Sequence, residues 1–260
     1  MKAEQAAKIQ KEKETRQTSL FGGSNGSQII QPSIPDIEPF SEIEKLKIEK
    51  DILGLYVSGH PLDKYSFEIE NLCNVNFKDI KENNNLKCKS VLYAAGIVTN
   101  VEHKISKNGK PYGNITIEDF TESYDFIFFS EEYVKFKNFF EEGWFLFLKG
   151  KMKNKWNNPD ELEFKIDDLG LLSKVRDNLI KELHLKINLD DINDELINEL
   201  NAKFKNARNG NCHLKITVVS NNNGRNISLD MISRDKRFFL EDNILESINS
   251  KPEIEYLINK

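Results

Sequence analysis

The 260-residue sequence has few cysteines and no long apolar run. Its cysteines, Cys73, Cys88 and Cys212, are scattered and form no Cys-x-x-Cys pair, so the sequence predicts neither a disulfide framework nor a zinc site. No apolar run approaches the roughly 20 residues that span a bilayer, and the charged start of the chain contains no signal-peptide core. We therefore expect a cytoplasmic protein without a membrane segment.

The sequence also lacks an excess of positive charge. It carries 37 Lys and Arg against 42 Asp and Glu, which gives a formal net charge of -5. This balance argues against a protein that coats nucleic acid through bulk charge, so any such contact must come from local clusters. The hydrophobic content of 38%, with 10% aromatics, indicates a folded chain of one or two domains.

The motifs that usually mark catalysis are missing as well. The sequence contains no phosphate-binding glycine loop, no nucleophile elbow and no His-Glu-x-x-His helix. Asp167-Asp168 and Asp190-Asp191 are typical of a strand end and a helix start, and the histidines have no partners at metal-ligand spacing. We expect no catalytic residue, no metal site and no cofactor in this chain.

The first 40 residues predict segments without a core of their own. Residues 1–16 are typical of a charged helix remnant, and residues 17–40 of a flexible Gly- and Ser-rich loop followed by a proline-rich linker. Gln17, Leu20 and Phe21 form a Gln-x-x-Leu-Phe pattern in that loop. Its amide can hydrogen-bond and its two apolar side chains can fill pockets, so the pattern suits a docking peptide. Alternatively, the two apolar side chains fold back onto the neighbouring domain.

Residues 41–89 predict a helical lead-in. Ser41 followed by Glu44 is a capping-box start, and apolar residues follow at helical spacing. We expect Gly59 to adopt the left-handed conformation at the end of this helix, and Pro61 prevents the helix from continuing. A shorter helix is expected to follow.

Residues 90–175 alternate as strands, with one helix after the third strand. Asn108-Gly109 between two alternating runs is a strong hairpin signal. The β-β-β-α-β-β order is that of an OB fold, a small barrel. On the third strand we expect Ile127 and Phe129 to be buried, and the pattern leaves Phe126 and Phe128 open. The expected elements are 91–105, 112–120, 124–129, 131–140, 144–155 and 162–172.

Residues 179–260 predict a separate small domain. The pattern alternates helical and strand periods, which is typical of an α/β domain. The expected fold class is therefore a mainly β OB-fold barrel with a helical lead-in and a small C-terminal α/β domain. The expected elements of that last domain are a strand at 183–187, a helix at 190–204, a hairpin of 213–219 with 226–232, a helix at 242–249 and a strand at 254–258.

Two loops of the predicted barrel are basic, and in OB folds these two loops frame the oligonucleotide groove. Alternation at period two places the lysines of the fourth strand on one face and Leu146, Leu148 and Met152 on the other, in the core. Lysines that neutralise phosphates, beside aromatic rings that stack on bases, hold single strands without reading sequence. Alternatively, these lysines form a solvated face that protects a strand edge against aggregation. The candidate nucleic-acid-binding residues are Lys104, Lys107, Lys110 and Tyr112 at the first loop, and Lys149, Lys151, Lys153, Lys155 and Trp156 at the second.

Two strings in the sequence resemble the bacterial DNA polymerase III alpha subunit family. One is Gly-Leu-Tyr-Val-Ser-Gly-His-Pro at 54–61, which is similar to a segment just before the OB domain of that family. The other is Gly-Lys-Pro-Tyr at 109–112 with Glu-Asp at 118–119. The terminal domain matches the family in general pattern only. The resemblance implies a C-terminal, non-catalytic part of a DNA-directed DNA polymerase, a nucleotidyltransferase of DNA replication, as a split-gene product or a fragment.

The resemblance also implies partners. Members of the family carry an internal motif for the sliding clamp (beta subunit) just upstream of the OB domain, so Gln17, Leu20 and Phe21 are implied to bind the clamp. The OB domain is implied to contact single-stranded template DNA, and the remainder of the alpha subunit, with any catalytic Mg ions, is implied to lie outside this chain. The terminal domain is similar to one that in some members binds the tau subunit of the clamp loader. A free-standing OB-fold protein of RNA or transfer-RNA metabolism, and an assembly scaffold that binds no nucleic acid, stay open as alternatives.

Overall fold

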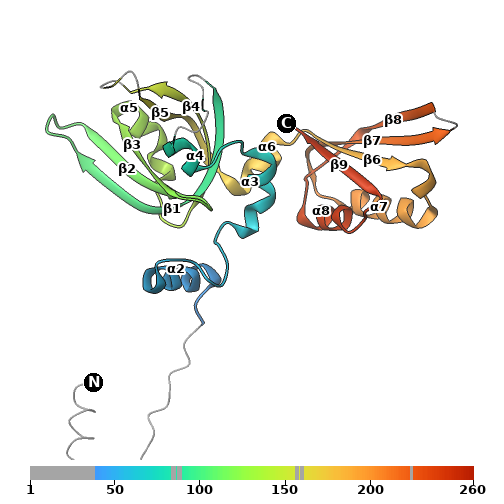
Figure 1. Ribbon diagram of the computed structural model, residues 1–260, viewed down its shortest axis with the longest axis horizontal. Helices are drawn as coiled ribbons and strands as arrows, with labels where there is room; N and C mark the ends of the chain where they lie inside the picture. The colour runs from blue at the N-terminus through green and yellow to red at the C-terminus, as the bar shows by residue number, and fades with distance from the viewer. Residues whose placement is uncertain (1–38, 83–85, 87–89, 156–157, 159–160, 223–224) are drawn as a thin grey trace, which may run out of the picture. The chain divides into compact units, whose positions relative to one another are not determined.

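The computed structural model describes residues 39–82, 86, 90–155, 158, 161–222 and 225–260 (Figure 1). The predicted helix remnant at 1–16 and the predicted clamp motif of Gln17, Leu20 and Phe21 lie outside the described residues. None of the helices that the structure describes has both the length and the apolar character that a bilayer crossing requires.

The lead-in begins with helix α2, Glu42–Leu53. It ends six residues before the predicted Gly59, because Gly54 adopts a left-handed conformation (φ +80°) and its N–H donates to the Lys50 carbonyl at 2.8 Å. No residue of α2 is buried, so tertiary packing does not extend the helix. The prediction of a helix that continues to the Gly-His-Pro string was therefore wrong.

Three short helices connect α2 to the barrel. They are η1 (Asp63–Tyr65), α3 (Ser66–Leu72) and α4 (Phe77–Glu82). Phe77 is fully buried, and its ring packs against Tyr124 and Phe126 at centroid distances of 6.1 and 5.9 Å. Its backbone N–H donates to the buried carboxylate of Asp119 at 2.6 Å, so α4 is fixed to the end of a barrel strand.

Five strands form one antiparallel sheet in the order β3-β2-β1-β4-β5. α5 (Ser130–Phe136) and η2 (Lys137–Phe139) lie between β3 and β4 in the chain, which confirms the predicted β-β-β-α-β-β order and the OB-fold class. β3 and β5 are the sheet edges, and no ladder closes the sheet between them among the described residues. The strands are β1 (Val91–Ile105), β2 (Pro111–Glu118), β3 (Ser123–Phe129), β4 (Phe145–Asn154) and β5 (Leu162–Leu171).

The barrel core confirms one face assignment and contradicts another. Leu146, Leu148 and Met152 are fully buried, as the alternation of β4 predicts. On β3, however, Phe126 and Phe128 are only 5% and 4% exposed, whereas Ile127 and Phe129 are 49% and 54% exposed. The expected burial of Ile127 and Phe129 was therefore wrong. Ser123 and Asp125 share a face with Ile127 and Phe129, so the alternation of the whole strand favours the observed orientation, and a shift by one residue exchanges the two faces.

The register with β2 explains the orientation of β3. Phe126 and Phe128 lie opposite Ile115 and Gly113, which are both buried. A Cβ atom at Gly113 would come within 2.4 Å of the Phe140 ring, so the missing side chain makes room for aromatic packing under the sheet. Phe128 uses that room and packs against Phe140 at 5.4 Å.

The C-terminal α/β domain is a four-stranded sheet in the order β8-β7-β6-β9, with α7 and α8 on one face (Figure 1). β6 and β7 are parallel, and the other pairs are antiparallel. The predicted elements are confirmed in type, and the helix predicted from 190 begins at 194, because the Asn193 side chain accepts from the Leu196 N–H at 2.8 Å as its N-cap. The elements are η3 (Leu172–Lys174), α6 (Val175–Leu179), β6 (Glu182–Asn188), η4 (Leu189–Asp191), α7 (Asp194–Asn206), β7 (Asn209–Asn222), β8 (Arg225–Phe238), α8 (Asp242–Asn249) and β9 (Ile254–Asn259).

Candidate nucleic-acid interface

Three neighbouring strands of the barrel carry Lys104, Tyr112 and Phe129 in one row. Lys104 on β1 lies opposite Tyr112 on β2, and Tyr112 lies opposite Phe129 on β3. Side chains directly opposite one another on paired strands share a face and lie about 5 Å apart. Together with Ile127 in the next row, these residues form a surface on the side of the sheet away from the core, which we call the outer β1–β3 face.

The aromatic pair at the centre of this face is stacked and accessible. The Tyr112 and Phe129 rings lie 5.5 Å apart at an interplanar angle of 24°. Phe129 is 54% exposed, although burial of an aromatic side chain is usually favourable. The pair presents flat apolar area beside the charged end of Lys104, an arrangement that suits a ligand with planar rings and negative charge.

The hairpin between β1 and β2 places two further lysines beside this row. Gly109 has a φ of +72°, which the predicted Asn-Gly turn requires, and its N–H donates to the Ser106 carbonyl at 2.9 Å. The Ser106 hydroxyl accepts from the Lys110 N–H at 3.1 Å. Lys107 and Lys110 are exposed at this tip, and no carboxylate of the described residues lies within ion-pair distance of either.

Lys104 is paired, but only at the surface. Its ammonium donates to Glu102 at 2.7 Å, which lowers the pKa of Glu102 and raises the pKa of Lys104. Both groups are therefore charged at neutral pH. A solvent-exposed pair of this kind contributes little to stability, so a phosphate can replace Glu102 as the partner of Lys104.

The second predicted lysine set lies on β4, and two of the lysines on its face meet one carboxylate. We call this surface, made of Lys149, Lys151, Lys153 and Val91, the β4 face; Val91 lies directly opposite Lys151. The ammonium groups of Lys151 and Lys153 both lie near Asp167 of β5, at 3.6 and 3.8 Å.

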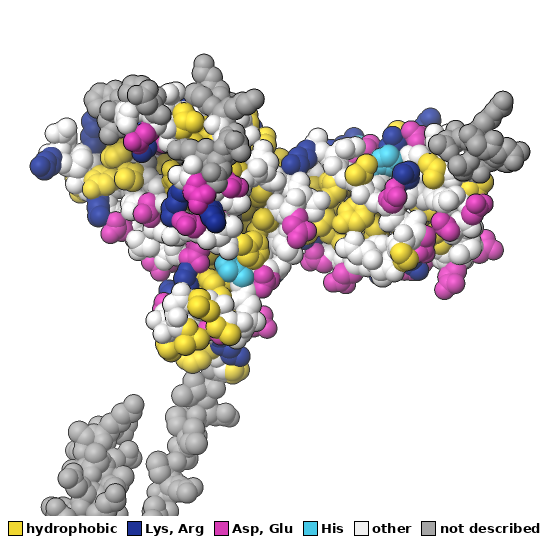
Figure 2. Space-filling view, viewed as in Figure 1, with side chains coloured by type: hydrophobic (Ala, Val, Ile, Leu, Met, Phe, Trp, Pro, Cys, Tyr) yellow, Lys and Arg dark blue, Asp and Glu magenta, His cyan; other side chains and the backbone are white. Residues whose placement is uncertain are grey.

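The loop beyond β4 shows the same compensation of charge. Lys155 donates to Glu161 at 2.6 Å and lowers the pKa of that carboxyl. Across the face of the molecule in Figure 2, Lys and Arg side chains are interspersed with Asp and Glu rather than gathered in one patch.

The structure therefore separates the nine predicted residues into groups. Lys104 and Tyr112 share one row with Phe129, which the sequence had led us to place in the core. Phe129 lies opposite Tyr112 on the neighbouring strand, so the alternation of β3 counted from that pair could have identified it as a surface residue. Lys149, Lys151, Lys153 and Lys155 lie along β4 and its end. Trp156 lies outside the described residues. Within the described ranges, His, Cys, Asp and Glu nowhere gather in a group of three that could hold a metal ion.

The Gly-His-Pro string has a local structural role. The His60 ring lies 4.9 Å from Tyr56 and 4.6 Å from Phe120, and its Nδ1 accepts from the Leu62 N–H at 3.2 Å. Burial lowers the pKa of His60, which favours the neutral ring that this hydrogen bond requires. These contacts fix the lead-in to the residues that follow β2.

Two segments of the chain match known families. Residues 183–259 match the family described as DNA polymerase III alpha subunit, C-terminal domain. Residues 93–172 match the family described as OB-fold nucleic acid binding domain. The second match covers the strands that carry the outer β1–β3 face.

Individual relatives extend these matches along the chain. The DNA polymerase III subunit alpha of Borreliella burgdorferi is 28% identical over 226 residues, which cover 85% of this chain and 19% of the relative. That of Campylobacter jejuni is 26% identical over 285 residues, covering 96% of this chain and 23% of the relative. The chain thus spans about a fifth of the length of these relatives. Among solved structures, the mitochondrial single-stranded DNA binding protein Rim1 of S. cerevisiae aligns with a TM-score of 0.26 and 17% identity, over 33% of this chain and 96% of Rim1.

Proposed function

We propose that this chain, which belongs to the DNA polymerase III alpha subunit family and matches its C-terminal region, binds single-stranded DNA through the outer β1–β3 face. The observation that carries the proposal is the row of Lys104, Tyr112 and Phe129, which combines an exposed stacked pair with a cation. Bases stack on aromatic rings in any sequence, and lysines neutralise the backbone between them. In this proposal Lys107 and Lys110 follow the phosphates past the hairpin tip. The domain holds a strand without catalysing a reaction on it.

Fluorescence anisotropy tests this proposal. The full chain is titrated into labelled oligo-dT at several salt concentrations, in parallel with oligo-rU and a DNA duplex. We expect oligo-dT to bind with an affinity that falls as salt rises, and the duplex to bind more weakly. Tighter binding of oligo-rU would support an accessory protein of RNA metabolism instead. Flat titrations with all three would support an assembly scaffold.

We also propose that the chain tethers a polymerase to its sliding clamp through Gln17, Leu20 and Phe21. The support is the Gln-x-x-Leu-Phe pattern, in the place where the family carries its clamp motif. The test is clamp binding by the full chain and by a Leu20→Ala, Phe21→Ala variant. The variant is expected to lose most of the affinity, and equal binding would remove the tether. Ile29→Ala with Ile30→Ala, two apolar residues of the same linker, is the matched control.

Two further partners follow from the family. The rest of an alpha subunit, with its catalytic domain, is proposed to act with this chain in the cytoplasm, and the C-terminal domain is proposed to bind the tau subunit of the clamp loader. The match of residues 183–259 to the alpha subunit's C-terminal domain supports the second proposal. Co-purification of tau with residues 1–260, but not with a chain that ends at residue 180, is the expected result.

A further inference from the structure

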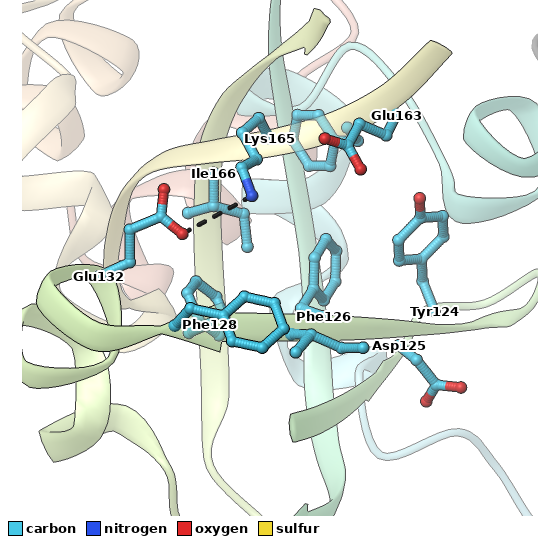
Figure 3. Close-up of a pocket in the computed structure, with 11 residues that line it drawn as sticks. Tyr124, Asp125, Phe126, Phe128, Glu132, Glu163, Lys165 and Ile166 are labelled. Atoms are coloured by element: carbon cyan, nitrogen blue, oxygen red, sulfur yellow. Dashed lines mark ion pairs between the residues drawn. The ribbon is translucent and has the colours of Figure 1, made fainter. Parts of the chain in front are cut away.

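The barrel wall contains a cavity between its two edge strands. The cavity has a volume of about 220 Å³ and lies between β3 and β5, which no ladder joins among the described residues (Figure 3). Phe126 and Ile166 point into it from the core, Phe164 also lines it, and the Phe126 and Phe164 rings lie edge to face at 6.0 Å. The floor of the cavity is therefore aromatic and apolar.

Tyr124 and one ion pair bound this cavity. At one end lies Tyr124, and burial raises the pKa of its hydroxyl. At the other end, the ammonium of Lys165 lies 3.6 Å from the carboxylate of Glu132 (Figure 3). Between these groups lies a slot whose walls are the edges of two strands, and strand edges carry backbone groups that are free to bond a ligand.

Glu163 supplies a hydrogen-bond acceptor at the mouth. It lines the cavity, and no lysine or arginine of the described residues lies within ion-pair distance of it. Asp125 accepts from the Thr116 hydroxyl at 2.7 Å and points away from the cavity. Lys165 is paired with Glu132, and Lys155 and Lys81 interact with Tyr124, so the mouth carries charges of both signs. A carboxylate accepts well from the exocyclic amino group of a base.

The cavity lies along the edge of β3, the strand that also carries Ile127 and Phe129 of the outer β1–β3 face. A single strand stacked on the Tyr112 and Phe129 rings therefore lies beside the same strand edge. A volume of about 220 Å³ is below the roughly 300–1,000 Å³ of pockets for drug-sized ligands, which fits a smaller planar group.

We propose that the cavity between β3 and β5 takes one nucleobase of the bound strand and favours a base that carries an exocyclic amino group. The inference rests on the proposed binding of single-stranded DNA. In this arrangement the base lies against the Phe126 and Phe164 rings, Glu163 accepts from its amino group, and Lys165 donates to a ring or carbonyl acceptor. Enzymes and receptors that extract single bases use the same combination of aromatic walls and edge hydrogen bonds.

Binding of oligo-dC and oligo-dT 12-mers at pH 7.5 tests the preference. Thymine carries no amino group, so the full chain is expected to bind oligo-dC about tenfold more tightly, as one hydrogen bond to a charged group supports. Glu163→Met is expected to remove the preference by weakening oligo-dC binding. Glu255→Met on β9, which removes an exposed carboxylate far along the chain, is the matched control and is expected to keep it.

Photocrosslinking of the wild-type chain to an oligonucleotide with 5-iodocytosine gives a readout that needs no variant. Adducts on Tyr124, Phe126 or Phe164 are expected. Equal affinity for both oligomers, with adducts on Tyr112 or Phe129 alone, would overturn the proposal that the cavity takes a base. The proposed binding of single-stranded DNA would still stand. Failure of both oligomers to bind would overturn both proposals.

Discussion

The outer β1–β3 face, with the hairpin lysines beside it, and the β4 face both carry lysines, yet their charges are used differently. On the first, Lys107 and Lys110 have no carboxylate partner among the described residues, and two exposed aromatic rings lie beside them. On the second, Lys151 and Lys153 share Asp167. A surface lysine that is paired with a carboxylate is therefore less available to a phosphate than one without such a partner. Only the first face combines free charge with a stacking surface.

Removal of the aromatic pair from the outer β1–β3 face is the change that we expect to lower oligo-dT affinity the most. Tyr112→Ala with Phe129→Ala is expected to weaken oligo-dT binding by about 10- to 100-fold, because stacking contributes about 1–3 kcal/mol per base. The slope of affinity against salt is expected to stay the same, since no charge changes. Anisotropy titrations measure both quantities. Leu257→Ala, which removes an exposed apolar side chain from β9, is the control and leaves both unchanged.

Charge removal on each face gives the next effect. Lys107→Gln with Lys110→Gln is expected to reduce the slope of log affinity against log salt by about 0.7 for each phosphate that the variant no longer neutralises. Lys151→Gln with Lys153→Gln is expected to change the slope by less than half of that, because Asp167 already compensates those charges. If the second pair changed the slope more than the first, the assignment of the faces would be reversed.

Freeing Lys151 and Lys153 from their shared carboxylate is expected to reduce the difference in DNA binding between the two faces. Asp167→Asn removes the carboxylate shared by Lys151 and Lys153. We expect affinity for oligo-dT to rise about two- to fivefold, with a steeper salt dependence as the freed charges reach phosphates. Asp190→Asn in η4 of the C-terminal domain makes the same change in net charge away from the β4 face. An equal gain in that variant would mean that net charge alone is responsible.

The smallest expected effect is a pH dependence at the end of β4. Lys155 lowers the pKa of Glu161 from its ordinary 4.5, so their pair contributes above the ordinary pKa and is lost as pH falls through the lowered one. Lys155→Gln is therefore expected to leave oligo-dT affinity unchanged at pH 7 and to reduce it about twofold once the pH is low enough to protonate Glu161. A twofold loss already at pH 7 would show that the lysine is available despite its partner.

Local signals in the sequence predicted most of the fold. The Asn108-Gly109 turn and the alternating strand patterns predicted the order of the elements along the chain, and α8 occupies the predicted 242–249. The errors arose where two local signals compete. Gly54 and Gly59 can each end a helix, and only packing decides between them. Asn193 lies close to the acidic pair that was taken for the helix start.

The site was less predictable than the fold, because it depends on register. Phe129 belongs to the outer β1–β3 face because it lies opposite Tyr112, and the apolar end of β3, from Phe126 to Phe129, does not by itself reveal its orientation. The pairing of Lys151 and Lys153 with Asp167 depends on the irregularity between Lys149 and Gly150 in the ladder with β5. Such irregularities re-aim side chains, and no spacing in the sequence indicated this one.

Hydroxyl-radical footprinting of the full chain, with and without oligo-dT, tests the contrast between the two faces most directly. Tyr112 and Phe129 report the outer β1–β3 face, and Val91, which is 39% exposed and lies opposite Lys151, reports the β4 face. The account predicts that oligo-dT protects Tyr112 and Phe129 from oxidation and leaves Val91 as reactive as before. Protection of Val91 with unchanged oxidation of Tyr112 and Phe129 would contradict it.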